Sequence, residues 1–134
     1  MTRKKIGALK TKFWQIFTRY IKLKYSEDGK YVSCFTCAKP LEIGTTNCQG
    51  GHWLPKKGYP FHYFTEDNVR PQCYHCNHSL EGNTAVFENH LRKEIGNKRV
   101  DDIYNSRHDF EKKDWIYYTE KIKEYTLKLK EYES

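Results

Sequence analysis

The chain has 134 residues, which predicts a single domain with a modest hydrophobic core. A formal net charge of +7 and an aromatic content of 16% are typical of nucleic-acid-binding surfaces, because cations neutralise phosphates and aromatic rings stack on exposed bases. No apolar run approaches the roughly 20 residues of a membrane span, and the basic first residues lack the apolar stretch of a secretory signal. The sequence therefore argues against a membrane partner. It predicts that the protein is located in a reducing cytoplasm.

Residues 1–30 are predicted to form a basic N-terminal helical segment, with the helix itself over residues 4–25. Its apolar side chains recur at spacings of three and four, which indicates one face packed on a core: Ile6, Leu9, Phe13, Ile16, Phe17 and Tyr20. The other sides carry cations that we expect to contact DNA phosphates, although a solvated surface is the alternative: Lys5, Lys10, Lys12, Arg19 and Lys22. The segment 26–29 is predicted to end the helix in a turn.

Residues 31–96 are predicted to form the central part of the domain. A short strand at residues 31–33 leads into Cys34, and from there to about residue 83 the chain is irregular and rich in glycine and proline. Such a segment rarely holds itself together by packing alone. Residues 84–95 return to helical spacing, and Gly96 is expected to end that helix.

Four of the five cysteines form two matched pairs, Cys34-Phe-Thr-Cys37 and Cys73-Tyr-His-Cys76. A two-residue gap lets both sulfurs of a pair reach the same ion, so the two pairs predict a tetrahedral structural Zn²⁺ site. The alternatives are four ordinary buried or free cysteines, or a redox-active pair, and the matched spacing favours zinc over both. Cys48 remains and is expected to be a small core residue.

A last helix is predicted over residues 109–133, running from about Asp109 to Tyr132. Its apolar residues alternate at spacings of three and four, as in the seam of a short coiled coil: Trp115, Tyr118, Ile122, Tyr125, Leu129 and Tyr132. This seam either packs on its own domain or joins two copies of the chain in a homodimer, and both readings stay open.

The segment between the cysteine pairs resembles the zinc-containing HNH (His-Me finger) nucleases. In that superfamily a histidine on a β-hairpin lies between two cysteine pairs, an asparagine sits near the second hairpin strand, and an asparagine or histidine follows the last cysteine. This chain offers His52, Asn68 and Asn77 in that order. The resemblance implies an α+β fold with a ββα-metal core. The four-cysteine zinc site would hold this core together, and N-terminal and C-terminal helices would flank it.

A closer resemblance, to the NinG (Rap) family of phage recombination proteins, covers most of the chain. It is carried by CFTCAKPL, CQGGHWLPKKG, EDNVRPQCYHCNHSLEGNTAVF and the basic N-terminal helix. Membership implies a phage-encoded endonuclease in the bacterial host cytoplasm. It also implies selectivity for branched DNA, such as Holliday junctions and D-loops, and recombination proteins as partners. Because a four-way junction needs two cuts on opposing strands, we predict a homodimer, formed either in solution or only on DNA, with the apolar residues of the last helix contributing to the contact.

The residue types fit phosphodiester hydrolysis. Neutral His52 can accept a proton from water near physiological pH, and the side-chain oxygen of Asn77 can bind Mg²⁺ or Mn²⁺. Asn68 is expected to hold the hairpin loop and to orient His52 indirectly. The zinc lies outside this chemistry, because four thiolates leave no open position on the ion.

One position departs from the HNH pattern. Many of these nucleases carry an aspartate directly before the base histidine as a second metal ligand, whereas this chain has Gly51. We expect Glu81 to replace it, because on a helix a residue four positions after Asn77 shares its face. The alternatives are Glu66, Asp67, or a metal ion with fewer protein ligands. The remaining histidines are expected to be structural or solvent-exposed: His62, His75, His78, His90 and His108.

Two other functions compete with a nuclease. A non-catalytic zinc-dependent DNA-binding module would keep the cysteines, the basic helix and the aromatic residues, but has no need for His52 and Asn77 in this arrangement. A structural adaptor would use the last helix to bind a partner protein. Incubation with supercoiled plasmid or a four-way junction and a divalent ion separates these functions, because only a nuclease nicks the DNA.

Overall fold

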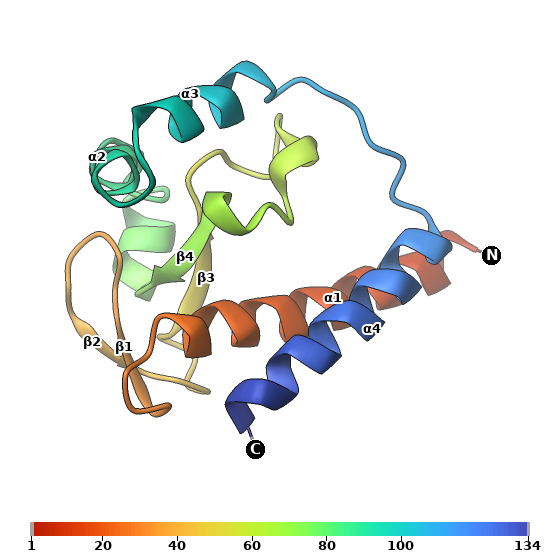
Figure 1. Cartoon of the computed structure of the whole chain (residues 1–134), viewed down its shortest axis with the longest axis horizontal. Helices are drawn as coiled ribbons and strands as arrows, with labels where there is room; N and C mark the ends of the chain where they lie inside the picture. Colours follow the sequence, from red (N-terminus) through yellow and green to blue (C-terminus); the bar gives the residue numbers. More distant parts are fainter. Residues whose placement is uncertain (1, 134) are drawn as a thin grey trace.

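Two long helices, α1 (Arg3–Lys24) and α4 (Trp115–Glu133), run side by side along one edge of the molecule (Figure 1). The computed structural model describes residues 2–133. Aromatic side chains fill the interface, where the Tyr125 ring lies 5.4 Å from Phe13 and 5.2 Å from Phe17. The apolar face predicted for the N-terminal helix is thus explained by its packing against α4.

The start of α4 corrects the predicted boundary. Residues 106–114 cross from α3 to α4 without helical structure for most of their length, and Phe110 is 87% exposed there. The helix begins at Trp115 because Asp114 caps it, accepting a hydrogen bond from the Tyr117 N–H at 3.0 Å. The charged segment before Asp114 has no apolar period that could pack on a core.

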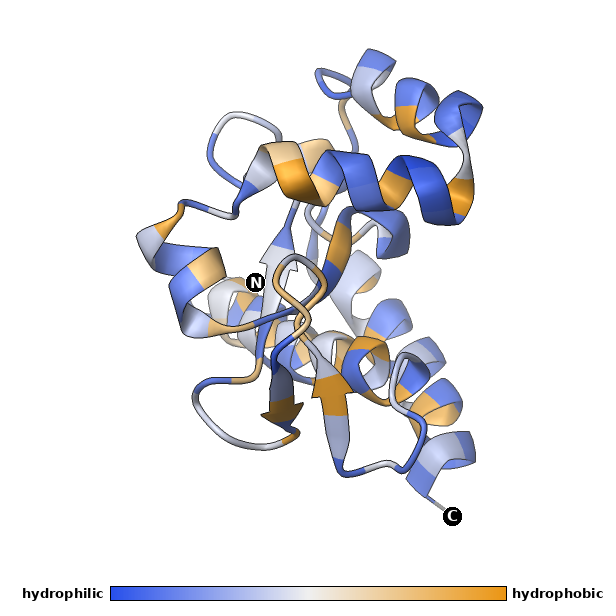
Figure 2. Ribbon diagram, turned by 90° about the vertical axis from the view of Figure 1, so that its left-hand side faces the viewer, coloured by the Kyte–Doolittle hydropathy of each residue, from blue (hydrophilic) through white to orange (hydrophobic). Residues whose placement is uncertain are grey.

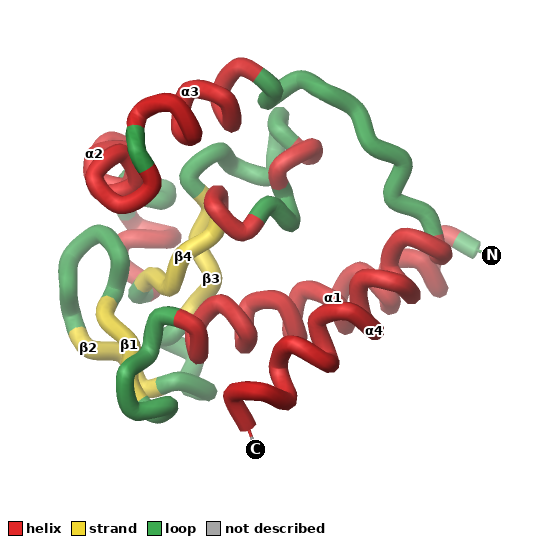
Figure 3. Tube along the Cα trace, in the orientation of Figure 1, coloured by secondary structure: helices red, strands yellow, loops and turns green. Residues whose placement is uncertain are grey.

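The central strands form two small antiparallel hairpins. β1 (Tyr31–Ser33) pairs with β2 (Pro40–Glu42), and β3 (Gln49–His52) pairs with β4 (Val69–Gln72). Figure 3 shows β3 and β4 between the α1–α4 pair and the α2–α3 pair. The stretch predicted to be irregular therefore contains three of the four strands, and the α+β class is confirmed.

A helical turn, η3 (His75–Ser79), follows β4 and precedes α2 (Thr84–Ile95). Gly96 ends α2 as predicted, with a φ of 90° that favours glycine. The next helix, α3 (Asn97–Asn105), was not predicted from the sequence. Together α2 and α3 cover a second buried cluster: Trp53, Leu54, Phe87, Leu91, Val100 and Ile103.

The helices alternate hydrophilic and hydrophobic residues along their length (Figure 2). Within residues 2–133, none of them is both long enough and apolar enough to span a bilayer.

Candidate functional site

The four paired cysteines meet at one point between the two hairpins. Cys34 follows β1 and Cys73 follows β4, and the ligand atoms of all four cysteines lie within 4.8 Å of one another. The backbone N–H of Cys73 donates to the Cys34 sulfur at 3.3 Å, and that of Cys76 donates to the Cys73 sulfur at 3.4 Å. Such bonds stabilise thiolates, so the donor set fits a structural Zn²⁺ ion.

Cys48 is excluded from this group. It is 2% exposed and lies in the hydrophobic cluster that surrounds the paired cysteines, but its sulfur does not belong to the group of four. Its place as a small core residue agrees with the prediction from the sequence.

A cleft of about 920 Å³ runs beside β3, and it brings three of the predicted site residues together. His52 comes from β3, Asn77 from η3, and Glu81 from the turn that follows η3. Lys22 of α1 lines the same cleft. The predicted catalytic residue Asn68 does not, because it is fully buried.

The hydrogen bonding of His52 defines how its ring can react. Its Nε2 lies 2.9 Å from the carbonyl oxygen of Tyr63, which can only accept, so Nε2 carries the proton. No hydrogen bond from residues 2–133 reaches Nδ1, which keeps its lone pair. Burial, together with the charges of Lys56 and Lys10, lowers the pKa of His52 to about 4, against the opposing effect of the Tyr63 carbonyl. The imidazole is therefore neutral at pH 7 and able to accept a proton.

Asn77 has an amide oxygen free for a ligand. Its Nδ2 donates to Oε1 of Gln49 at 2.9 Å, which orients the side chain. Within the described part of the chain, Oδ1 has no hydrogen-bond partner. An amide oxygen is a ligand suited to Mg²⁺ or Mn²⁺.

Glu81 lines the cleft for a different reason than the one predicted. The helical turn η3 ends at Ser79, and Glu81 has a φ of 49°, in the left-handed region. Asn77 and Glu81 therefore do not share a helical face, and the spacing argument is wrong. The tight turn through Gly82 places Glu81 at the cleft instead, with its side chain exposed.

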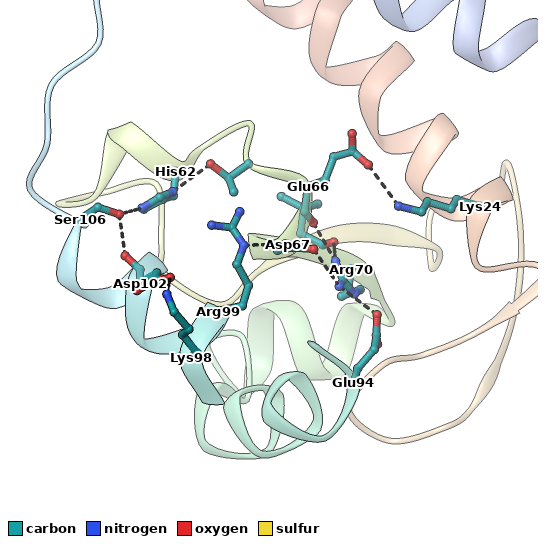
Figure 4. Close-up of polar contacts among 12 residues, drawn as sticks. Lys24, His62, Glu66, Asp67, Arg70, Glu94, Lys98, Arg99, Asp102 and Ser106 are labelled. Carbon is teal, nitrogen blue, oxygen red and sulfur yellow. Dashed lines mark hydrogen bonds and ion pairs between the residues drawn. The ribbon is translucent and has the colours of Figure 1, made fainter. Parts of the chain in front are cut away.

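The two alternative acids, Glu66 and Asp67, form ion pairs away from the cleft (Figure 4). Glu66 accepts hydrogen bonds from Lys24 at 3.3 Å and from the Tyr125 hydroxyl at 2.6 Å. Asp67 pairs with Arg99 at 2.8 Å. Neither carboxylate lines the cleft, so among residues 2–133 Glu81 is the one acid at its surface.

Asn68 clamps the loop between β3 and β4. Its Oδ1 accepts from the Leu54 N–H at 2.8 Å, while its Nδ2 donates to the carbonyls of Leu54 and His62 at 3.1 and 3.0 Å. The buried amide of Asn68, at the end of the loop, therefore holds the start of the loop in place. Within residues 2–133 no hydrogen bond joins the side chains of Asn68 and His52, so the indirect orienting role expected for Asn68 stays a prediction.

Gly51 has no room for a side chain. A Cβ there would collide with the side chain of Gln72, which is fully buried and donates to the Thr36 hydroxyl and the Gly82 carbonyl. An aspartate at position 51 would have to displace Gln72. The glycine at this position is thus a consequence of local packing.

The five basic residues that were predicted to contact DNA do not form one continuous surface at the cleft. Lys22 alone among them lines it. Arg19 pairs with Glu133 at 2.8 Å, and Lys10 lies over the Tyr63 ring at 4.5 Å. Lys5 and Lys12 are exposed away from the cleft lining.

Sequence reasoning missed two cations of the cleft, Lys56 and Lys57. They follow His52 closely in the segment HWLPKKG, and that proximity is the signal that could have found them. With Lys22 they give the cleft three lysines against the single carboxylate of Glu81, counted over the described residues. The cleft is therefore suited to a polyanion.

Of the other histidines, His78 also lines the cleft, while the rest stay outside it. His62 bridges Thr65 and Ser106, each at 2.8 Å, and so ties the end of α3 to the loop (Figure 4). His90 contacts the Phe35 carbonyl at 2.6 Å. The prediction that these histidines are structural or solvent-exposed fits all five, because His75, His78 and His108 are exposed. His78 is exposed at the cleft itself.

The fold and the cysteine cluster define a small α+β protein in which four cysteines that could hold a metal ion lie beside a basic cleft. The family model described as Bacteriophage Lambda NinG protein matches residues 2–134. The chain therefore belongs to the phage NinG family. No curated protein and no solved structure matches it.

Proposed function

We propose that this chain is a metal-dependent DNA endonuclease of the HNH class. The observation that carries the proposal is His52, which is neutral, bonded through Nε2 to a carbonyl and free at Nδ1 in a basic cleft that also holds Asn77. The hairpin β3–β4 followed by η3 supplies the two strands and helical turn of a ββα-metal core. A binding module without catalysis has no use for a base held in this way.

In this mechanism Nδ1 of His52 accepts the proton of the water that attacks the scissile phosphate. Asn77 and Glu81 are the residues that would hold Mg²⁺ or Mn²⁺, which when bound stabilises the charge on the phosphate and the leaving oxygen. Lys22, Lys56 and Lys57 hold the flanking phosphates. The zinc cluster keeps β4 and η3 in place and takes no part in the reaction.

The proposed substrate is branched DNA formed during phage recombination, such as Holliday junctions and D-loops. Membership of the NinG family and the charge of the cleft support this choice. The proposal places the protein in the cytoplasm of the bacterial host, together with recombination proteins.

The test compares cleavage of supercoiled plasmid, linear duplex, D-loop and four-way junction with Mg²⁺ or Mn²⁺. We expect the wild type to nick, with the branched substrates preferred. His52→Ala should lower the rate by about 10² to 10⁴ while DNA affinity and zinc content stay near wild type. His108→Ala is the matched control, because His108 is exposed and does not line the cleft.

A wild type that only retards the DNA in a gel, with every metal tried, would point to the non-catalytic DNA-binding module. Cleavage by His52→Ala at the wild-type rate would place the base elsewhere.

A further inference from the structure

The ring of His52 is stacked on an aromatic side chain from outside the hairpin. Trp14 of α1 lies parallel to it, with ring centroids 5.0 Å apart and an interplanar angle of 10°. Tyr63 meets the same imidazole edge-on at 4.9 Å, and its ring lies 5.1 Å from Trp14. Two aromatic rings therefore confine the imidazole, one parallel to it and one steeply inclined to it.

Trp14 itself is held in place by the core. Its ring lies 6.1 Å from Phe17 and 6.2 Å from Phe64, and both phenylalanines are buried. Rigid neighbours allow the indole to act as a fixed surface and not as a mobile cover.

Gly50 allows α1 to approach the hairpin so closely. A Cβ at this position would lie 2.6 Å from Cγ2 of Thr18 and 3.3 Å from Cζ2 of Trp14. Gly50 does not have a positive φ, so its backbone conformation is open to any residue. What requires glycine here is the space between β3 and α1, and that same space sets the position of the indole over His52.

We propose that Trp14 is a positioning residue for the base His52. The hydrogen bond to the Tyr63 carbonyl fixes one atom of the imidazole but leaves the ring able to tilt about that atom. Stacking on Trp14 fixes the plane of the ring, and with it the direction of the Nδ1 lone pair into the cleft. The inference rests on the proposed function, in which Nδ1 removes a proton, and it adds α1 to the elements that catalysis requires.

The test uses two substitutions that should each disturb the stacking of Trp14 on His52. Trp14→Leu removes the flat ring, and Gly50→Ala pushes α1 away from β3. Both should lower the single-turnover cleavage rate at saturating DNA and Mg²⁺ by about 10- to 100-fold, since a base misplaced by about 1 Å costs that much. Trp14→Phe restores a flat ring and should recover most of the rate. Dissociation constants for DNA should change by less than about threefold, and each rate is measured below the variant's unfolding temperature.

Two matched controls separate this effect from general damage. Trp115→Leu changes a tryptophan that is 45% exposed on α4, and Gly7→Ala adds a methyl group where nothing lies within 4 Å. Both should cleave at the wild-type rate.

A second measurement reports the stack without activity. The ring protons of His52 should show an upfield ring-current shift by NMR in the wild type and in Trp14→Phe, and lose it in Trp14→Leu. Unshifted ring protons in the wild type would overturn the inference, as would Trp14→Leu cleaving at the wild-type rate or Trp14→Phe being equally slow. A wild type that shows the shift but cuts no DNA would overturn the proposed function, and the kinetic role of Trp14 with it.

Discussion

His52 links the chemistry of the cleft to the stability of the fold. Burial lowers its pKa from 6.5 to about 4, so between these values the unfolded chain binds a proton that the folded chain does not. The free energy of unfolding should therefore fall as the pH drops from 6.5 towards 4, by up to about 3 kcal/mol from this one group. Urea denaturation of the wild type and of His52→Asn, at pH 7 and at pH 4.5, measures the difference.

The asparagine variant has no titrating group at this position, so it should lose less stability on acidification than the wild type. His62, whose pKa burial also lowers, is present in both proteins and cancels in the comparison. Equal losses for the two proteins would mean that the imidazole of His52 is protonated as easily in the folded chain as in the unfolded one.

The candidate site could be predicted in part, residue by residue. The order of cysteines, histidine and asparagines along the chain was enough to choose His52 and Asn77, which the structure places at one cleft. The contact of Trp14 with His52 could not be predicted, because 38 positions separate them in the sequence and only the packing of α1 on β3 joins them. The sequence also does not show why position 51 is a glycine, because the buried Gln72 that leaves no room for a side chain there belongs to the other strand of the hairpin.

At the scale of the elements, the cysteine group joins the hairpin β1–β2 to β4 and η3. These short segments have few other buried apolar residues, so the free energy of metal binding should be part of the free energy of folding. Cys34→Ser or Cys76→Ser should abolish both the bound zinc and the cooperative unfolding transition. Elemental analysis and thermal unfolding measure the two losses.

Cys48→Ser is the matched control for the zinc prediction, since Cys48 is equally buried but lies outside the group of four. It should retain one zinc ion per chain. Folded, active wild type without zinc would contradict the structural role of the cluster.

The helix α1 carries cations with different surroundings, and this predicts different effects on binding. Lys22 lines the cleft, burial lowers the pKa of its ammonium group, and no carboxylate from residues 2–133 pairs with it. Lys22→Gln should weaken DNA binding about equally for all sequences and reduce the slope of log K against log salt by about 1. Titrations at several salt concentrations measure this slope.

Lys12→Gln is the control for Lys22→Gln, because Lys12 is exposed on the same helix but does not line the cleft. It should leave the salt slope unchanged. The reverse result, with Lys12 and not Lys22 affecting the slope, would place the DNA on the outer surface of α1.

The longer helices and the strand β1 could be predicted, whereas β2, β3 and β4 could not. Helices α1 and α2 each show an apolar face over three turns or more, so their periods are readable in the sequence. The strand β3 reads Gln-Gly-Gly-His, which has no apolar alternation, and its pairing with β4 depends on contacts with α1 and the loop. Helix α3 buries only Val100 and Ile103, too few positions to define a period.

The shape of the whole molecule bears on whether two copies of the chain associate, as the proposed cleavage of a junction requires. The apolar seam of α4 packs on its own chain, because its central residues Tyr118, Tyr125 and Leu129 are buried in the hydrophobic core of the same molecule. On the outer side of α4, the exposed apolar residues Ile116 and Leu127 are separated by charged ones. This surface lacks the continuous apolar core of a stable homodimer interface.

We therefore expect the free protein to sediment as a monomer of 16.1 kDa. The proposed cleavage of a four-way junction needs two active sites for paired cuts on opposing strands, and the junction offers two equivalent arms to two copies of the chain. Sedimentation with a junction should give two chains per DNA, whereas a linear duplex of one arm's length should bind one.

Tyr125→Ala should lower the unfolding temperature of the free protein and leave its mass unchanged, because Tyr125 packs on α1 of its own chain. A dimer at micromolar concentration without DNA, dissociated by Tyr125→Ala, would instead assign the seam of α4 to contacts between chains.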